Sequence, residues 1–409
     1  MIFSHLKAKR KDILYTKGFS KHKRIYRSKS NRILFVGMAE SSHFERWVSV
    51  TVDNFPEAQV YIFPSDSPHL KKSGIKSLKV KSNSVKIFQL IPFARINYLA
   101  YFFLDYFFGM TWRAFILRYF MLLIRPKIVH FHEMQHAAYI YNYIYDYKRT
   151  HSDAKYIIST WGSDLNLYSY LSGNKHQVET CLKWVDVVTA ERSIEQIVLQ
   201  EYEFNKQFVA PMYITVGRDI ADTQNLSRTS ERKSIIVKGY QDTSGRALNV
   251  IQVLSEISES LVDFEILVFS ASDSVKAHVD YLNNSNGMKI RVLNRMPNSD
   301  LQKYFRNSRI YIGMSISDGL STSMVEAMSA GTFPIQSANS AAPKFLVDGQ
   351  SGFVVDPWDL PTLKESILKA LEDDLLVDAA AELNLETLKR KFSLEIGIEK
   401  MRSLYIDLS

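Results

Sequence analysis

The sequence has little of what secreted or fibrous proteins depend on. It contains one cysteine in 409 residues, Cys181, so no internal disulfide can form and a metal site would have to use histidine and carboxylate ligands. Its 16 glycines and 11 prolines are too few for a collagen-like or low-complexity chain. Because 46% of the residues are hydrophobic and 23% charged, we expect a cytoplasmic globular protein with two domains.

Acidic residues are scarce in the first half of the chain. Residues 1–215 hold 17 Asp and Glu against 30 Lys and Arg, whereas 216–409 hold 26 against 21. The first half should therefore attract anions: nucleic acid, an anionic membrane surface or a phosphate-bearing substrate. Residues 1–31 form a basic arm without the apolar region of a secretory signal. Both a solvated tail and a segment that adheres to anionic lipid fit this arm.

No long hydrophobic run is free of charge. Residues 99–124 are apolar enough and long enough to span a bilayer. However, Asp105, Arg113 and Arg118 would each be costly near the bilayer centre, and Gly109 indicates a break. We predict two amphipathic helices here, either buried or lying on a membrane surface.

Short β-branched and aromatic runs alternate with segments of helix length along most of the chain. The first series occupies 32–215, a polar stretch at 216–233 interrupts it, and a second series occupies 234–376. Strands that are apolar throughout are typical of parallel sheets covered on both faces. We therefore predict an α/β protein with two Rossmann-like, doubly wound domains that face a central cleft, followed by a helical segment at 377–409.

Residues 314–335 carry the clearest functional pattern. A strand ends in this segment, Asp318 and Gly319 form a turn, and Ser321 or Thr322 can cap the helix that follows. The free N–H groups at such a helix N-terminus favour a phosphate.

Two carboxylates, Asp318 and Glu326, would flank that anion site and could accept hydrogen bonds from sugar hydroxyls. A purely structural alternative remains open. Ser323 and Glu326 fit a capping box, and Asp318 with Gly319 fits an ordinary turn.

The run DGLSTSMVEAMSAGTFPI at 318–335 resembles the signature of retaining family-4 glycosyltransferases of GT-B fold. In that family an acidic residue and a glutamate eight positions later span the donor-sugar site. The resemblance implies that Asp318 faces the sugar and that Glu326 holds the ribose. It also implies that the amides of Gly319, Leu320 and Ser321 bind the diphosphate. Asp318 stands where the family usually has glutamate.

A further segment of the second half is similar to this family. SIIVKGYQDTSGRAL resembles the first strand and loop of the nucleotide domain, which implies that Lys238 and Arg246 grip the donor diphosphate. With Asp318, these are the residues expected to act in catalysis. Residues that recognise the donor base are expected near Arg295 and Met296, and the sequence does not distinguish a UDP donor from a GDP donor.

The first half resembles the same family in two loops. FVGMAESSHFERW resembles the glycine loop and first helix of a subgroup, which implies a donor-side position for Gly37 and acceptor-side positions for His43 and Arg46. STWGSDL matches an element that often reads His-Gly-x-Asp. Trp161 takes the histidine place, Asp164 keeps the pattern, and both are expected to face the acceptor.

Three neighbouring histidines, His130, His132 and His136, suggest a metal site. Apart from Glu133, no carboxylates accompany them at a usual ligand spacing. We predict no metal and no cofactor, with a nucleoside-diphosphate sugar as co-substrate.

The resemblance implies a retaining hexosyltransferase that moves a sugar from a nucleotide sugar to a hydroxyl of a glycan or lipid-linked glycan. Bacterial surface polysaccharide or lipopolysaccharide synthesis is the expected context, peripheral to the cytoplasmic face of the membrane. The C-terminal helical segment is expected to cross back to the first domain. Two alternatives remain: a sugar-nucleotide epimerase of the same architecture, and a non-catalytic membrane- or nucleic-acid-binding module. No nucleic-acid motif supports the latter.

Overall fold

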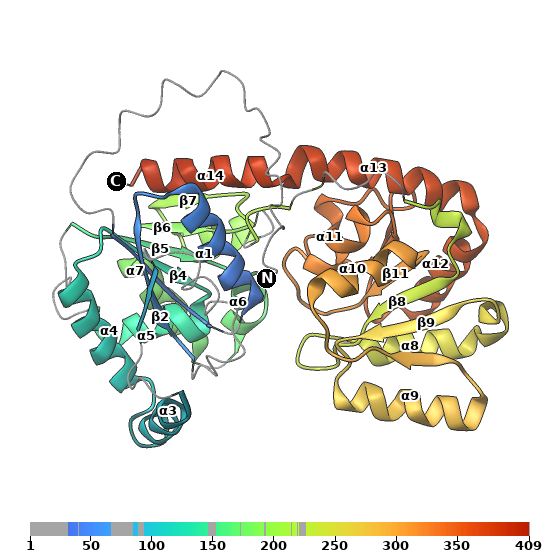
Figure 1. Ribbon diagram of the computed structural model, residues 1–409, viewed down its shortest axis with the longest axis horizontal. Coiled ribbons are helices and arrows are strands. Elements are labelled where there is room, and N and C mark those ends of the chain that lie inside the picture. Colours follow the sequence, from blue (N-terminus) through green and yellow to red (C-terminus); the bar gives the residue numbers. More distant parts are fainter. Residues whose placement is uncertain are drawn as a thin grey trace, which may run out of the picture.

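Two parallel sheets, one in each half of the chain, organise the fold (Figure 1). The computed structural model describes residues 32–39, 41–66, 85–88, 94–145, 153–171, 173–191, 194–213, 215–218, 220 and 226–408. The basic arm at 1–31 and residues 221–225 of the polar linker lie outside these residues. Helices cover both faces of each sheet, so the predicted α/β class with two doubly wound domains is confirmed.

The first sheet has seven strands in the order β3-β2-β1-β4-β5-β6-β7. Its apolar strands pack on both faces, with Leu34 and Val36 in one hydrophobic cluster and Ile33 and Phe35 in another. The strands are β1 (Arg32–Gly37), β2 (Gln59–Pro64), β3 (Val85–Ile87), β4 (Ile128–His132), β5 (Lys155–Ser159), β6 (Val187–Thr189) and β7 (Gln207–Val209). The α-helices of this half are α1 (Ser42–Asn54), α3 (Ala94–Phe108), α4 (Thr111–Ile124), α5 (Tyr139–Asn142), α6 (Ser163–Asn166) and α7 (Asn174–Trp184).

The second sheet has six strands in the order β10-β9-β8-β11-β12-β13. These strands are β8 (Ser234–Lys238), β9 (Glu265–Phe269), β10 (Ile290–Val292), β11 (Ile310–Gly313), β12 (Phe333–Ser337) and β13 (Phe353–Val355). The helices that cover this sheet are α8 (Ala247–Glu256), α9 (Asp273–Asn286), α10 (Asn298–Asn307), α11 (Thr322–Ser329), α12 (Leu360–Glu372) and α13 (Asp374–Phe392).

In both sheets the strand order reverses beside the first strand of the domain. The chain winds outward from β1 to β3 and then returns to β4 on the other side, and it does the same from β8 to β10 and back to β11. Ligands of open parallel sheets bind outside the carboxyl ends of the strands at such a switch point. This rule directs attention to the loops that follow β1, β4, β8 and β11.

The last two helices connect the second domain to the first. α13 packs against α11, and α14 (Leu394–Ile406) lies over the first domain against α1 (Figure 1). The indole Nε1 of Trp47 in α1 donates a hydrogen bond of 2.8 Å to the hydroxyl of Tyr405 in α14. The chain therefore crosses between the domains twice, once at the linker and once between α13 and α14.

The apolar segment at 99–124 forms two helices with a sharp bend. The helices α3 and α4 meet at 115° across the break at Gly109 and Met110, as the sequence predicts. Among the described residues, no single helix is long and apolar enough to cross a membrane.

Candidate functional site

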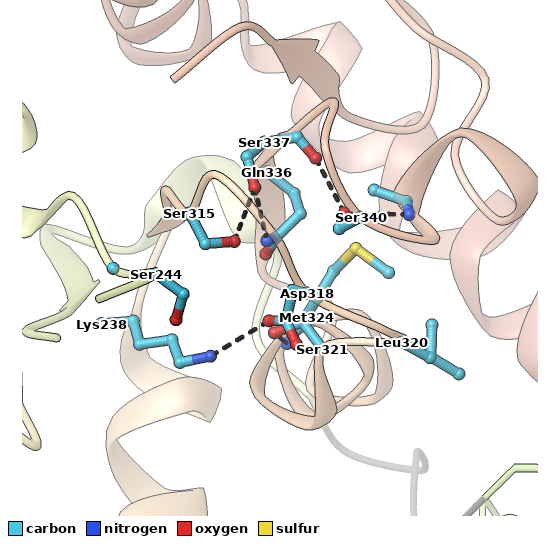
Figure 2. A network of polar contacts seen from close by, with 12 residues as sticks. Lys238, Ser244, Ser315, Asp318, Leu320, Ser321, Met324, Gln336, Ser337 and Ser340 are labelled. Carbon is cyan, nitrogen blue, oxygen red and sulfur yellow. Dashed lines mark hydrogen bonds and ion pairs between the residues drawn. The ribbon is translucent and has the colours of Figure 1, made fainter. Parts of the chain in front are cut away.

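A lysine and an aspartate face one another at the switch point of the second sheet. Lys238 ends β8, and Asp318 lies in the loop between β11 and α11. The Nζ of Lys238 donates to Oδ2 of Asp318 over 3.3 Å (Figure 2). Burial lowers the pKa of Lys238, but the charges of Asp318 and of two nearby tyrosines, together with this hydrogen bond, outweigh it and raise the pKa. Lys238 is therefore a fixed positive charge at the carboxyl edge of the sheet.

The loop after Asp318 leads into a capped helix. The Oγ of Ser321 accepts a hydrogen bond of 3.4 Å from the amide of Met324, so Ser321 is the N-cap of α11. Glu326 is buried, and its Oε1 accepts from Arg218 at 3.0 Å and from Asn298 at 2.7 Å. The capping-box alternative for Glu326 is therefore wrong, because this carboxylate is held by residues from outside its own helix.

Two aromatic side chains of the first domain come close to this pair. The rings of His43 in α1 and Trp161, which follows β5, pack edge to face with centroids 5.6 Å apart. Burial lowers the pKa of His43 to about 4, with Asp318 opposing the shift and Lys238 adding to it. The two charged groups of the second domain thus act on His43 across the domain boundary, and His43 is neutral at pH 7.

The backbones of two loops meet between the domains. A Cβ placed on Gly162 would lie 2.7 Å from Cα of Gly319, and a Cβ on Gly319 would lie 2.9 Å from the carbonyl oxygen of Trp161. Gly162 also has φ +98°, a conformation that side-chain-bearing residues rarely adopt. Glycine at both positions is what allows the loop after β5 to touch the loop after β11.

Sequence reasoning missed Glu191, which joins the domains at the same point. It follows β6 in the first domain, and its Oε1 accepts a hydrogen bond of 2.6 Å from the amide of Leu320. Burial, together with Asp318 and Asp164, raises the pKa of Glu191 to about 8, against the effect of the Leu320 hydrogen bond. Its Oε2 is buried with no hydrogen-bond partner among the described residues. The available signal was a carboxylate two residues beyond a buried strand.

The contact with Glu191 affects one of the three backbone amides that are expected to bind the diphosphate. The Leu320 N–H, expected to bind the diphosphate, is occupied by Glu191 in this structure, and the Leu320 side chain points away from Lys238 and Asp318 (Figure 2).

Two of the residues expected at the acceptor side have other contacts. Asp164 is only 1% exposed; its Oδ1 accepts from the amide of Trp161 at 2.8 Å and its Oδ2 from that of Met134 at 3.3 Å. Burial raises its pKa to about 6, although backbone hydrogen bonds oppose the shift. Arg46 donates to the carbonyl of Gly217 in the linker at 3.4 Å. Asp164 therefore shapes the Trp161 loop, and Arg46 connects α1 to the linker.

Three other residues predicted on the donor side have contacts of their own. Arg246 bonds to the carbonyl of Gly245 at 2.6 Å, and its guanidinium lies 4.9 Å from the ring centre of Trp358. Gly37 ends β1, where a Cβ would lie 2.7 Å from the ring of Phe44, so it permits α1 to pack closely. Met296 lies in the loop after β10, where it is partly buried against the second domain's core.

The rings of two of the three histidines, His130 and His132, lie side by side with centroids 4.3 Å apart. Both ring nitrogens of His130 are within hydrogen-bond distance of hydroxyls, Tyr405 at 2.9 Å and Ser159 at 2.7 Å. Over the described ranges, no three His, Cys, Asp or Glu side chains are grouped so that they could hold a metal ion.

Part of the chain matches a known protein family. Residues 225–386 match the family model for glycosyl transferases group 1. The chain is similar to O-antigen chain mannosyltransferase B of Escherichia coli, with 32% identity over 101 residues, which are 25% of this chain and 26% of that protein. The chain thus spans about a quarter of the length of this relative.

Solved structures resemble the whole fold. The structure superposes on sucrose-phosphate synthase of Thermosynechococcus elongatus with a TM-score of 0.71 and 13% identity, covering 93% of this chain and 99% of the other. It superposes on Anabaena HepE in complex with UDP with a TM-score of 0.67 and 11% identity, covering 92% and 100%. Residues 225–386, which carry Lys238, Asp318 and Glu326, thus match the glycosyl transferases group 1, in a chain that has the GT-B fold.

Proposed function

We propose that the protein is a retaining glycosyltransferase that moves a sugar from a nucleoside-diphosphate sugar to a hydroxyl of a glycan or lipid-linked glycan. The observation that carries this proposal is the Lys238–Asp318 pair, which lies at the switch point of the second sheet and acts electrostatically on His43 of the first domain. A cationic group, a carboxylate and a helix N-terminus converge there from one domain, and aromatic groups lie near them from the other.

The second domain would hold the donor. Glu326 would accept hydrogen bonds from the ribose, and Asp318 from hydroxyls of the transferred sugar. Lys238, Arg246 and the amides of α11 would oppose the charge that develops on the leaving diphosphate, which is commonly the largest contribution to such catalysis. We propose that no divalent ion is required, so turnover should persist in EDTA.

The first domain would present the acceptor hydroxyl. In the proposed reaction a bond forms between the anomeric carbon and the acceptor oxygen as the bond to the diphosphate oxygen breaks. Attack occurs on the face from which the diphosphate leaves, and the proton of the hydroxyl passes to that diphosphate. Because His43 is neutral at pH 7, its ring can accept a hydrogen bond from the acceptor hydroxyl and orient it.

The chemistry of the relatives supports a nucleotide-sugar donor and a polysaccharide product. One relative is named as an O-antigen chain mannosyltransferase, and the structural neighbour HepE is described with bound UDP. We infer bacterial surface polysaccharide synthesis on the cytoplasmic side of the membrane.

A donor panel tests the activity. Purified protein is incubated with UDP- and GDP-sugars, with and without glycan acceptors, and the released nucleoside diphosphate is measured. Release that depends on the acceptor supports transfer, and retention of configuration in the product is read by NMR. Conversion of the donor to an epimer without acceptor would refute the transferase proposal.

We also propose that α3 and α4 contact an anionic membrane. Their outer side chains are exposed and apolar, with Tyr106 77% and Phe107 68% exposed. Two of the three charges that disfavour insertion pair with each other: Arg113 Nε donates to Asp105 Oδ1 at 2.9 Å, and Trp112 Nε1 donates to the same oxygen at 2.9 Å. A large exposed apolar patch in a basic domain fits a lipid surface.

Vesicle co-sedimentation tests this surface. The full-length protein should bind anionic vesicles at low salt and leave them at high salt, and a chain beginning at Ser30 should bind less. Phe107→Ser should weaken binding, whereas Leu375→Ser, an equally apolar and exposed change in α13, should not. Full-length protein that stays in the supernatant at low salt would refute the membrane proposal.

A further inference from the structure

One side chain connects the crossing between the domains to the buried carboxylate proposed to bind the ribose. Arg218 lies in the polar linker, which the sequence marks only as a domain boundary. Its side chain is 24% exposed, so it is neither a surface charge nor a core residue.

The backbone of Arg218 is fixed to the second crossing. Its amide donates to the carbonyl of Phe392 at 2.9 Å, and its carbonyl accepts from the amide of Leu394 at 2.8 Å. These two bonds lie on either side of Ser393, the residue between α13 and α14. The preceding Gly217 has φ +93°, and a Cβ there would lie 2.5 Å from the carbonyl oxygen of Ser393. The two crossings therefore form one tightly packed unit.

The side chain of Arg218 extends from this unit to Glu326. NH1 lies 3.0 Å from Oε1 of Glu326, whose side chain is 7% exposed, and Nδ2 of Asn298 lies 2.7 Å from the same oxygen. A buried carboxylate needs such partners, because removing one leaves an uncompensated charge. Both described donors use Oε1, which leaves Oε2 as the oxygen that can turn to a ligand.

We propose that Arg218 is a positioning residue that holds the Glu326 carboxylate for the nucleotide and couples nucleotide binding to the relative placement of the two domains. This inference rests on the proposed function, since it takes Glu326 as the ribose-binding group. A ligand that donates a hydrogen bond to the Glu326 carboxylate changes the ion pair between Glu326 and Arg218. The backbone of Arg218 is hydrogen-bonded to both crossings, so this change reaches them. By linkage, the arrangement of the crossings must then affect nucleotide affinity to the same extent.

The test compares Arg218→Ala and Arg218→Lys with Arg228→Ala. Arg228 is an exposed residue of the same linker and serves as the matched control. Affinity for UDP and GDP is measured by calorimetry, donor KM and kcat by turnover, and the radius of gyration with and without nucleotide by small-angle X-ray scattering.

We expect Arg218→Ala to weaken nucleotide binding by about tenfold or more, the usual effect of losing a charged hydrogen bond. Donor KM should rise with a smaller change in kcat, the nucleotide-dependent change in radius should diminish, and Arg218→Lys should restore part of each effect. Arg228→Ala should match the wild type. The inference would be overturned by a folded Arg218→Ala variant whose nucleotide affinity lies within threefold of the wild type and whose radius of gyration changes with nucleotide as that of the wild type does.

A measurement without ligand separates this inference from the proposed function. If the wild type binds and turns over no nucleotide sugar, the proposed function fails. The ion pair is then tested by a double-mutant cycle of Arg218→Ala and Glu326→Gln in denaturant unfolding. Additive effects would show that the two residues are not coupled and would overturn the inference; a clear coupling supports the positioning of Glu326 by Arg218. If Arg218→Ala does not fold, Arg218→Lys replaces it in both experiments.

Discussion

Replacing Glu191 with glutamine should remove a pH dependence from the contact between the two domains. In the structure Glu191 is 5% exposed and accepts a hydrogen bond from the Leu320 amide of the opposite domain. Asp318 and Asp164 face it, and with burial they raise its pKa from 4.5 to about 8. The closed contact therefore contains neutral Glu191 at pH 7, whereas a solvated Glu191 would be charged.

The direction of this pH dependence follows from proton uptake by Glu191 when the contact forms. Because the pKa is higher in the closed state, the contact is most favourable below pH 4.5 and weakens as the pH rises through about 8. One pKa unit corresponds to about 1.4 kcal/mol, so closure costs about 3 kcal/mol more at pH 7 than at pH 4.5, and about 4 kcal/mol more above pH 8. Glutamine keeps the oxygen that accepts the Leu320 bond and needs no proton. Glu191→Gln should therefore favour the closed arrangement at pH 7 by up to about 3 kcal/mol.

Small-angle scattering from pH 6 to 9 measures this effect, supported by hydrogen exchange of the Leu320 amide. The wild type should expand and exchange faster toward pH 9, and Glu191→Gln should remain compact throughout. Burial also raises the pKa of Glu133 to about 8, so the two proteins are compared at each pH. Glu195→Gln, a partly exposed change in the same segment, is the control. Identical pH profiles for the wild type and Glu191→Gln would refute the reasoning.

Three other substitutions test the site. Glu326→Gln should keep the fold but weaken nucleotide binding, because it removes the charged acceptor that the ribose would use; unchanged donor kinetics would contradict the ribose assignment. Lys238→Ala should cost about 2–4 kcal/mol of transition-state stabilisation, as loss of a charged donor at an oxyanion does, and kcat/KM within threefold of the wild type would reject the role of Lys238. Gly319→Ala should push the loop away from the carbonyl of Trp161, 2.9 Å from the new Cβ, and lower kcat with little change in thermal stability; full activity would show that this close approach is not needed.

Local patterns predicted much of the fold because they depend on neighbours in the chain. The apolar strands and the polar linker predicted two parallel sheets, and Gly109 predicted the break between α3 and α4. The cap of α11 was predicted as Ser321 or Thr322, and the hydrogen bond to Met324 identifies Ser321. The resemblance to retaining glycosyltransferases rested on the run beginning at Asp318, and the family match covers that run.

Tertiary structure decided which side chains meet. Lys238 and Asp318 are 80 residues apart in sequence, and they pair only because β8 and β11 are neighbours in the second sheet. Glu191 follows a strand and Arg218 lies in the polar linker, but neither position indicates a partner; each becomes informative only through a contact with a residue more than 100 positions away in the sequence. The sequence by itself determined the strands, the helix cap and the family resemblance, because periodicity, capping and short motifs are local properties. The structure alone decided the partners of buried charges, because desolvation and pairing depend on chain segments that folding brings together.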